Sequence, residues 1–308
     1  MSDIVIALGG GGIKGISHIG VLSRLEKAGF RIRAIAGTSA GSIVGALYAA
    51  GLLPDQIANL ICGVDQTKLF GRKPNDGPSL LGVTGLTDAL SEILGTKTFE
   101  ELSIPFACTA VDLHTSQEII LNSGSVLDSI LASSAFPGIF PPRSVGKALL
   151  VDGAVLDPVP VALARWLHPG LPVVAVCLSP QPEKWAHLTP PSIPANSPIP
   201  KPIFEQISKL RIAQSFQIFS QSMDIISRQM AELRMQSENP DVIIRPDVEK
   251  YGLLDYVNPE ELILEGDLAA CKIIPALQKS TRFVAKIART LAGEARLPGK
   301  KLEIPKRE

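Results

Sequence analysis

The stretch IRAIAGTSAGSIVGALYAA, residues 32–50, decides the fold. Residues 32–36 are mostly apolar and predict a buried strand, and the small and apolar residues Ser42 to Ala50 predict a helix. Between them lies Gly37-Thr38-Ser39-Ala40-Gly41, a G-x-S-x-G sequence. A serine with glycines two positions before and after it, between a strand and a helix, is typical of a sharp turn that exposes a nucleophilic hydroxyl. A Gly-Ser turn without chemistry is the alternative interpretation.

The same strand–turn–helix order occurs once before this stretch. Residues 3–8 form a continuous apolar run, Gly9 to Gly12 interrupt it, and Ile16 to Ala28 carry apolar residues at helical spacing. Two such units in succession indicate an α/β fold with a parallel sheet covered by helices. Further strands are predicted at 104–111, 118–121, 148–151, 173–178 and 241–245, helices at 126–132, 203–236 and 259–278, a loop at 64–85 and a tight turn region at 137–142.

The composition limits the class of protein. The chain has 308 residues, 45% of them hydrophobic, with 30 basic and 30 acidic side chains. This is enough apolar material for a sizeable core, and the even charge balance does not suggest a nucleic-acid partner. No secretory signal and no run of about 18 apolar residues is present, so we expect a cytoplasmic protein whose contact with a membrane, if any, is peripheral. The four cysteines, Cys62, Cys108, Cys177 and Cys271, have no metal or redox spacing and are expected to be buried free thiols.

The chain divides into three parts in sequence. Residues 1–275 are predicted to form one domain, interrupted at 180–202 by an excursion with eight prolines, too many for a helix or a central strand. Residues 276–308 form a basic tail, interpreted as a solvated end or as a segment that contacts an anionic membrane. The loop 68–73 and Trp185 in the excursion are candidate lids or interfacial anchors, or ordinary surface loops. The Met and Phe stripe of the helix at 203–236 is expected to face the core.

A glycine loop follows the first strand. Gly10 to Gly15 satisfies the G-x-G-x-x-G pattern of dinucleotide-binding proteins, but the second strand does not end in the acidic residue that would hold a ribose. A P-loop would require Gly-Lys-Ser/Thr, and Gly15 is followed by Ile16. A third use remains, in which consecutive N–H groups and the helix dipole stabilise an anion such as the oxyanion of acyl transfer. The N–H of Ala40 would add another donor.

A serine nucleophile requires a base. His18, His114, His168 and His187 are the only histidines, and none lies in a sequence context typical of a catalytic triad. Asp152 follows the apolar strand at 148–151, at a strand end, where functional groups of parallel sheets gather. An Asp-Gly hairpin turn is the other interpretation. An isolated aspartate has a pKa near 4, and desolvation would be needed to make it a better base.

Together these segments resemble the patatin-like phospholipase family. Gly10-Gly11-Gly12-Ile13-Lys14-Gly15 resembles its glycine-rich motif, Gly37 to Gly41 its nucleophile motif, Asp152-Gly153-Ala154 its Asp-Gly-Gly/Ala motif, and residues 132–141 a segment that precedes the catalytic aspartate. The resemblance is strong over residues 3–180 and weak to about 275. It implies a three-layer α/β/α sandwich with a mostly parallel central sheet.

The resemblance also implies a chemistry and a site. Ser39 would be the nucleophile and Asp152 the general base of a lipid acyl hydrolase with an acyl-serine intermediate. The oxyanion hole would comprise Gly10, Gly11, Gly12 and Ala40, supported by Lys14, Gly15, Gly37, Gly41 and Gly153. No metal or cofactor is implied, and the partner is a lipid substrate. Lys14 is expected to add positive potential or to be a solvated lysine, and His18 to pack a helix. The alternatives are a soluble carboxylesterase or thioesterase acting on short acyl chains and a catalytically silent lipid-binding regulator.

Overall fold

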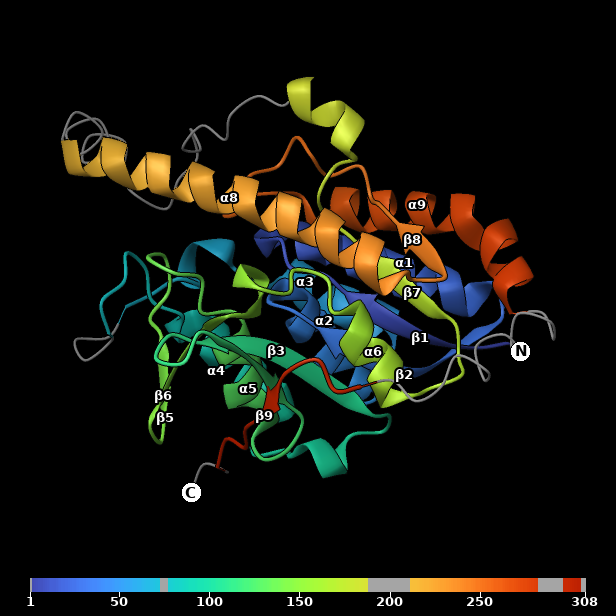
Figure 1. Cartoon of the computed structure of the whole chain (residues 1–308), viewed down its shortest axis with the longest axis horizontal. Coiled ribbons are helices and arrows are strands. Elements are labelled where there is room, and N and C mark those ends of the chain that lie inside the picture. Colours follow the sequence, from blue (N-terminus) through green and yellow to red (C-terminus); the bar gives the residue numbers. More distant parts are fainter. Residues whose placement is uncertain (1, 73–76, 188–210, 282–295, 306–308) are drawn as a thin grey trace.

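The protein is a three-layer α/β/α sandwich, as the sequence predicts. The computed structural model describes residues 2–72, 77–187, 211–281 and 296–305. Within these residues a nine-stranded sheet forms the middle layer, and helices cover both of its faces (Figure 1). Five of its eight strand pairings are parallel and three are antiparallel, so the sheet is mixed but mostly parallel.

The parallel part of the sheet has the order β3-β2-β1-β7-β8. These strands are β1 (Ser2–Leu8), β2 (Phe30–Gly37), β3 (Phe106–Asp112), β7 (Val173–Val176) and β8 (Val242–Ile244). Two strands run antiparallel to β3, namely β4 (Gln117–Leu121) and β6 (Ala148–Asp152), and β5 (Arg143–Val145) is antiparallel to β6. The short β9 (Lys300–Lys301) pairs in parallel with β4.

Alternating residues of the strands belong to two separate cores. In β1, Ile4, Ile6 and Leu8 belong to the larger core, whereas Val5 and Ala7 belong to the smaller one. The larger core is closed by α1 (Ser17–Lys27), α2 (Ala40–Ala49), α3 (Pro54–Gly63), α4 (Thr84–Leu94), α5 (Val126–Ser133) and α9 (Pro259–Ser280). The smaller core is closed by α6 (Val161–Leu167) and α8 (Arg211–Glu238). Because successive side chains of a strand point to opposite faces, the continuous apolar runs of the strands supply both cores.

Most predicted elements are confirmed, and three helices and two short strands of the described chain are additions. The predicted strands and helices are present within a few residues of their predicted ends, and short 3-10 turns lie at η1 (Gly12–Ile16), η2 (Gln66–Lys68), η3 (Phe99–Glu101), η4 (Gly153–Val155) and η5 (Pro182–His187). The helices α3 and α6 and the strands β5 and β9 were not predicted, and α4, also not predicted, begins inside the predicted loop 64–85. The Pro-rich excursion beyond residue 187 and the first part of the predicted helix 203–236 lie outside the described residues.

Two of the four cysteines differ from the prediction. Cys108 and Cys177 are buried free thiols of the sheet region, but Cys62 and Cys271 are exposed free thiols. Both exposed cysteines lie on helices, where an apolar neighbourhood in sequence does not decide which side faces outward.

In the candidate lid regions, the ring of Phe70 packs on Phe140, with ring centroids 5.4 Å apart, and Trp185 Nε1 donates to the carbonyl of Pro180 at 3.0 Å.

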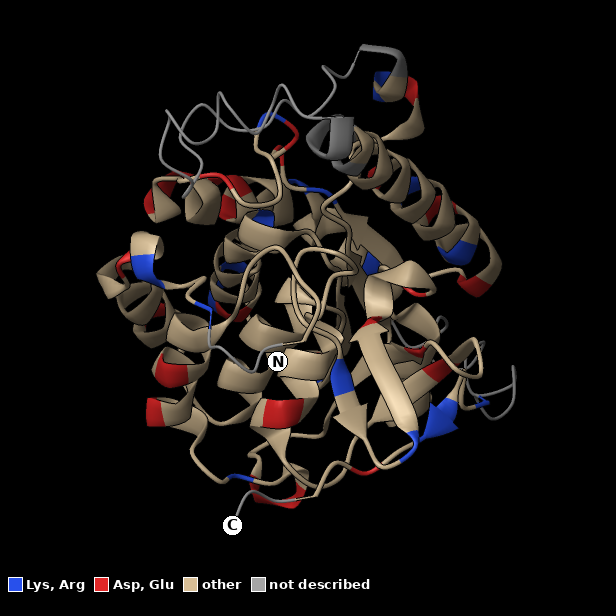
Figure 2. Ribbon diagram, turned by 90° about the vertical axis from the view of Figure 1, so that its left-hand side faces the viewer, with Lys and Arg blue, Asp and Glu red and all other residues tan. Residues whose placement is uncertain are grey.

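The outer face of α8 contradicts the expectation that its apolar stripe faces the core. Ala231 and Met235 are buried, but Ile218, Phe219, Ile225, Ile226 and Leu233 are between 41% and 64% exposed. The described charged side chains of α8 instead form ion pairs within the helix and with other elements. Figure 1 shows α8 running across the outside of the molecule, and in Figure 2 basic and acidic positions are both distributed along the described ribbon. No helix of the described chain combines the length and apolarity that a membrane span requires.

Part of the basic C-terminal segment packs on the sheet. β9 pairs with β4, the amide of Ser125 donates to the carbonyl of Ile304 at 2.8 Å, and the side chain of Ile304 is buried. The ammonium of Lys301 lies 4.7 Å from the centre of the Trp166 ring, within range of a cation–π contact. A solvated end therefore does not describe residues 300–304.

Candidate active site

Ser39 occupies a strained turn between β2 and α2. Its φ of 52° and ψ of −125° lie in a region that residues with a side chain rarely adopt. The flanking glycines are required sterically. A Cβ on Gly41 would lie 2.2 Å from the carbonyl oxygen of Leu8, and one on Gly37 would lie 2.6 Å from the Cα of Ser42. The chain can therefore reverse direction at Ser39 only with glycines at these two positions.

Asp152 lies directly against Ser39. The hydroxyl of Ser39 donates to Asp152 Oδ2 at 2.6 Å, and the amide of Ala154 donates to Asp152 Oδ1 at 2.8 Å. Both side chains are almost fully buried, and the contact joins residues 113 positions apart in sequence. Asp152 is followed by η4 and not by a hairpin turn. Gly153 fits here because a Cβ would lie 2.1 Å from Thr109 Oγ1.

Burial changes the acidity of Asp152. Desolvation of the carboxylate raises the pKa of Asp152 to about 7, although the hydrogen bonds from Ser39 and Ala154 lower it. A carboxyl group with a pKa near the working pH is a far better general base than an ordinary aspartate, because it is both available and basic enough to accept a proton. The weak basicity expected from the sequence is thereby corrected by the environment of the side chain.

The glycine loop lies beside the elbow. A Cβ on Gly10 would lie 3.2 Å from the Cβ of Ser39, and Gly11 and Gly12 have positive φ values of 157° and 60°. Within the described chain, the N–H groups of Gly11, Gly12 and Ala40 donate no hydrogen bond to protein. N–H groups without a protein acceptor can bind an anion.

Gly10 differs from its predicted role as an oxyanion donor. Its N–H donates to the carbonyl of Pro158 at 2.9 Å, so this N–H is already occupied. Gly10 contributes to the site because it has no side chain, which lets the loop lie close to Ser39. A sequence pattern of consecutive glycines cannot show which N–H groups are already bonded.

Ser133 is a site residue that the sequence did not single out. Its hydroxyl accepts the N–H of Ser39 at 2.9 Å, and the side chain is fully buried at the end of α5. The only signal was indirect, since Ser133 lies in the segment 132–141 that carries part of the family resemblance. The bond holds the backbone of Ser39 in place.

Lys14 lies half-buried in η1, with the side chains of Asp224 and Arg228 among its electrostatic neighbours. Burial lowers the pKa of the Lys14 amine, and the carboxylate of Asp224 opposes this effect. No ion pair of Lys14 occurs within the described residues. Its ammonium is therefore not fully neutralised by a fixed partner.

No described histidine side chain is a hydrogen-bond partner of Ser39. His18 is fully buried in α1, its Nε2 lies 2.8 Å from the carbonyl oxygen of Gly9, and burial lowers its pKa to about 4. A neutral His18 therefore donates to Gly9, in keeping with the predicted packing role. His114 and His168 lie on the surface against carbonyl groups. In the described chain, no group of three or more His, Cys, Asp or Glu side chains could hold a metal ion.

The fold and the site define an α/β protein in which a serine at a strand–helix elbow is hydrogen-bonded to a buried aspartate. The model of the patatin-like phospholipase family matches residues 6–165, just over half of the chain. The chain therefore belongs to the patatin-like phospholipase family, and the resemblance found in the sequence is confirmed.

Individual relatives give the extent of the similarity. An uncharacterised NTE family protein of Mycobacterium tuberculosis is 36% identical over 178 residues, which are 57% of this chain and 49% of the relative. A second such protein of the same species is 29% identical over 273 residues, 86% of this chain and 45% of the relative. The lysophospholipase NTE1 of Debaryomyces hansenii is 34% identical over 170 residues, 52% of this chain and 11% of the relative. The chain thus spans about half the length of its mycobacterial relatives.

A solved structure supports the fold. The crystal structure of VipD from Legionella pneumophila superimposes with a TM-score of 0.51, covering 89% of this chain and 67% of VipD. The sequence identity is only 13%, so the likeness shows a shared fold and not a shared activity.

Proposed function

We propose that the protein is a lipid acyl hydrolase in which Ser39 is the nucleophile and Asp152 its general base. The observation that carries the proposal is the 2.6 Å hydrogen bond from the Ser39 hydroxyl to the buried carboxylate of Asp152. A hydroxyl group bonded to a base in this way satisfies the geometric requirement for an activated nucleophile.

The reaction proceeds in two halves. Ser39 Oγ attacks the ester carbonyl carbon while its proton passes to Asp152 Oδ2, which gives a tetrahedral oxyanion. Collapse of this intermediate breaks the bond to the leaving oxygen, which takes the proton from Asp152 and departs as the alcohol. Water then attacks the acyl-serine and gives a proton to Asp152, and that proton returns to Ser39 Oγ as the fatty acid is released.

The oxyanion would be stabilised by the free N–H groups of Gly11, Gly12 and Ala40. Ala40 directly follows Ser39, and Gly11 and Gly12 follow Gly10, on which a Cβ would lie 3.2 Å from the Cβ of Ser39. None of the three N–H groups donates a hydrogen bond within the described chain. One such donor is worth about 2.7–4 kcal/mol in the transition state, so two or three account for much of a rate enhancement.

The substrate class follows from the family and from the relatives. The family is named for phospholipases, and one relative is a lysophospholipase. We therefore propose acyl esters of phospholipids or lysophospholipids as substrates. Lys14 would add positive potential near the phosphate of such a lipid. The Lys14→Ala variant should lose more activity on an anionic ester than on a neutral one, and an equal loss on both would contradict this role.

We also propose that the substrate is taken from a lipid surface in contact with α8. Ile218, Ile225 and Leu233 expose 59–64% of their surface, and the described charged side chains of α8 are held in ion pairs. An exposed apolar stripe of this kind fits the uncharged hydrocarbon boundary of a membrane better than it fits water.

Vesicle binding tests this surface. Replacing Ile218 and Ile225 with serine should weaken co-sedimentation with phosphatidylcholine vesicles and leave hydrolysis of a monomeric ester unchanged. The matched control is Leu53→Ser with Leu113→Ser, since both leucines are more than half exposed on other parts of the molecule. Equal binding by the two double variants would overturn the proposed contact.

Activity-based labelling tests the catalytic pair. A fluorophosphonate should label Ser39 in the wild type, and Asp152→Ala should reduce labelling and lipid hydrolysis at least 100-fold, in the range found when a catalytic base is removed. Asp112→Asn is a suitable control, because Asp112 is also buried but contacts a different turn. Labelling of Asp152→Ala at the wild-type rate would contradict the proposal. If the enzyme hydrolyses only short, monomeric esters and no long-chain lipids, the esterase or thioesterase alternative is favoured.

A further inference from the structure

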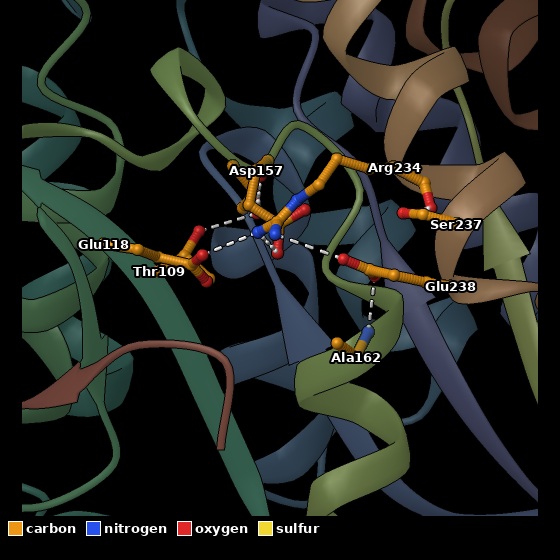
Figure 3. A network of polar contacts seen from close by, with 8 residues as sticks. Thr109, Glu118, Asp157, Ala162, Arg234, Ser237 and Glu238 are labelled. Atoms are coloured by element: carbon orange, nitrogen blue, oxygen red, sulfur yellow. Dashed lines mark hydrogen bonds and ion pairs between the residues drawn. The ribbon is translucent and has the colours of Figure 1, made fainter. Parts of the chain in front are cut away.

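Arg234 of α8 joins carboxylates from three parts of the chain. Its Nη2 lies 2.6 Å from Glu118 Oε2 of β4 and 2.8 Å from Asp157 Oδ2, and its Nη1 lies 3.2 Å from Glu238 Oε1 (Figure 3). Asp157 is completely buried, and Glu118 is nearly so. A single guanidinium thus supplies the positive charge for three carboxylates in a dry environment.

The main chain of Asp157 connects both halves of the Ser39–Asp152 pair. Its N–H donates to the carbonyl of Gly153 at 2.8 Å, and its carbonyl accepts the hydroxyl of Thr38 at 2.9 Å. Gly153 directly follows Asp152, and Thr38 directly precedes Ser39. One residue is therefore hydrogen-bonded to the chain neighbour of the nucleophile and to the chain neighbour of the base.

The position of Asp157 depends on its charge partner. Its carboxylate oxygens form no hydrogen bond of good geometry in the described chain, so the ion pair with Arg234 is the main compensation for their burial. Burial raises the pKa of Asp157 well above its usual range, while the charge of Arg234 lowers it. Without Arg234, the buried carboxyl group would have to take up a proton or move toward water, and either change would disturb the loop from Gly153 to Asp157.

We infer that Asp157 and Arg234 are positioning residues that hold Ser39 and Asp152 at hydrogen-bond distance. Neither residue needs to touch the substrate. The inference rests on the proposed function, and it adds α8 to the elements that determine the geometry of the pair. A displacement of about 1 Å at a catalytic contact can reduce the rate by about 100-fold, so such an anchor has a measurable effect on turnover.

The test compares Arg234→Gln with a matched ion-pair variant of the same helix. Glu232 of α8 and Arg245 are also largely buried, 2.5 Å apart, but neither contacts the loop from Gly153 to Asp157. Arg234→Gln should lower kcat and the fluorophosphonate labelling rate about 10- to 100-fold, with KM within twofold of wild type. Glu232→Gln should leave the labelling rate within about twofold of wild type, whatever its effect on thermal stability.

A second substitution separates positioning from general stability. Adding Asp157→Asn to Arg234→Gln removes the carboxylate charge at residue 157, which no longer has a partner, and keeps the main-chain hydrogen bonds of that residue. The double variant should therefore recover at least half of the lost labelling rate, measured on a logarithmic scale. Wild-type labelling of Arg234→Gln, an equal loss in Glu232→Gln, or no restoration in the double variant would each overturn the inference.

If Arg234→Gln does not fold, Thr38 provides the same test from the other side. Thr38→Val removes the hydroxyl group that donates a hydrogen bond to the carbonyl of Asp157, and Thr38→Ser keeps this hydroxyl group. Loss of labelling in Thr38→Val together with recovery in Thr38→Ser supports the inference, and equal rates overturn it. If the wild type is not labelled at Ser39, the proposed function is overturned, and the inference with it. If the wild type is labelled and the variants are labelled at the same rate, the inference alone is overturned.

Discussion

Gly15 and Ala40 pack so closely that a Cβ on Gly15 would lie 2.5 Å from the Cβ of Ala40. This contact fixes the distance between the glycine loop and the first residue of α2. Because the N–H groups of Gly11, Gly12 and Ala40 belong to these two segments, their relative position determines whether they converge on one oxyanion.

Gly15→Ala should therefore separate the loop from the elbow. We expect kcat to fall about 100-fold with a small change in KM, since the misplacement affects the transition state more than the bound ester. The Gly63→Ala variant is the control, because a Cβ there meets no atom within 4 Å. Combining Gly15→Ala with Ala40→Gly removes the steric conflict and should recover activity. A Gly15→Ala enzyme with wild-type kcat would contradict this account.

The pKa of Asp152 predicts the pH dependence of activity. Burial raises this pKa to about 7, and only the ionised carboxylate can accept the proton of Ser39. The value of kcat/KM should thus increase about tenfold per pH unit below 7 and level off above it. Steady-state kinetics on a neutral, monomeric ester between pH 5 and 9 measure this limb, and a flat profile would exclude Asp152 as the base.

The same burial predicts the effect of pH on stability. Between pH 4 and 7 the native protein keeps a proton on Asp152 that the unfolded chain has lost, so the free energy of unfolding decreases as the pH rises through this window. The Asp152→Asn variant has no such charge to bury. It should be more stable than wild type by about 2–4 kcal/mol at pH 8, and the difference should vanish below pH 4. Urea denaturation at both pH values provides the comparison.

Ser133→Ala should damage both stability and turnover. It leaves the buried N–H of Ser39 without its acceptor, which costs about 1–3 kcal/mol. Since that bond holds the elbow, kcat should fall about tenfold. Ser129 on the same helix is also fully buried but bonds within the helix, to the carbonyl of Ser125. Ser129→Ala should therefore lose some stability and keep its kcat, and equal kcat losses would show that Ser133 acts only through packing.

Much of the fold was predictable because local patterns determine it. The apolar runs, the glycines around Ser39 and the helical spacing after each turn identified the strands, the elbow and a parallel sheet covered by helices, and the resemblance to the family added the three-layer order. Asp152 was singled out as a partner of Ser39, and its carboxylate lies 2.6 Å from the Ser39 hydroxyl, but the reason given for it was wrong. It was expected at the carboxyl edge of a parallel sheet, but β6 runs antiparallel to β3, with Asp152 opposite Ala110.

The remaining parts depend on contacts that no local pattern encodes. Periodicity identified α8 as amphipathic but could not show that Arg234 would point to a buried Asp157, which leaves Ile218 and Ile225 facing outward. Likewise, the bonded N–H of Gly10 is a property of its distant neighbour Pro158. Burial and charge pairing between segments far apart in sequence decide such details, and they become visible only in three dimensions.

The backbone of Ser39 has a consequence for the evolution of the protein. A residue with a side chain at φ 52° and ψ −125° costs about 1–3 kcal/mol, which glycine would largely avoid. Selection for thermal stability alone would thus favour Ser39→Gly, a variant without a hydroxyl group. If Ser39 is the nucleophile, as proposed, stability and activity are in direct conflict at this one residue, and a thermostability screen blind to hydrolysis is expected to recover the glycine variant.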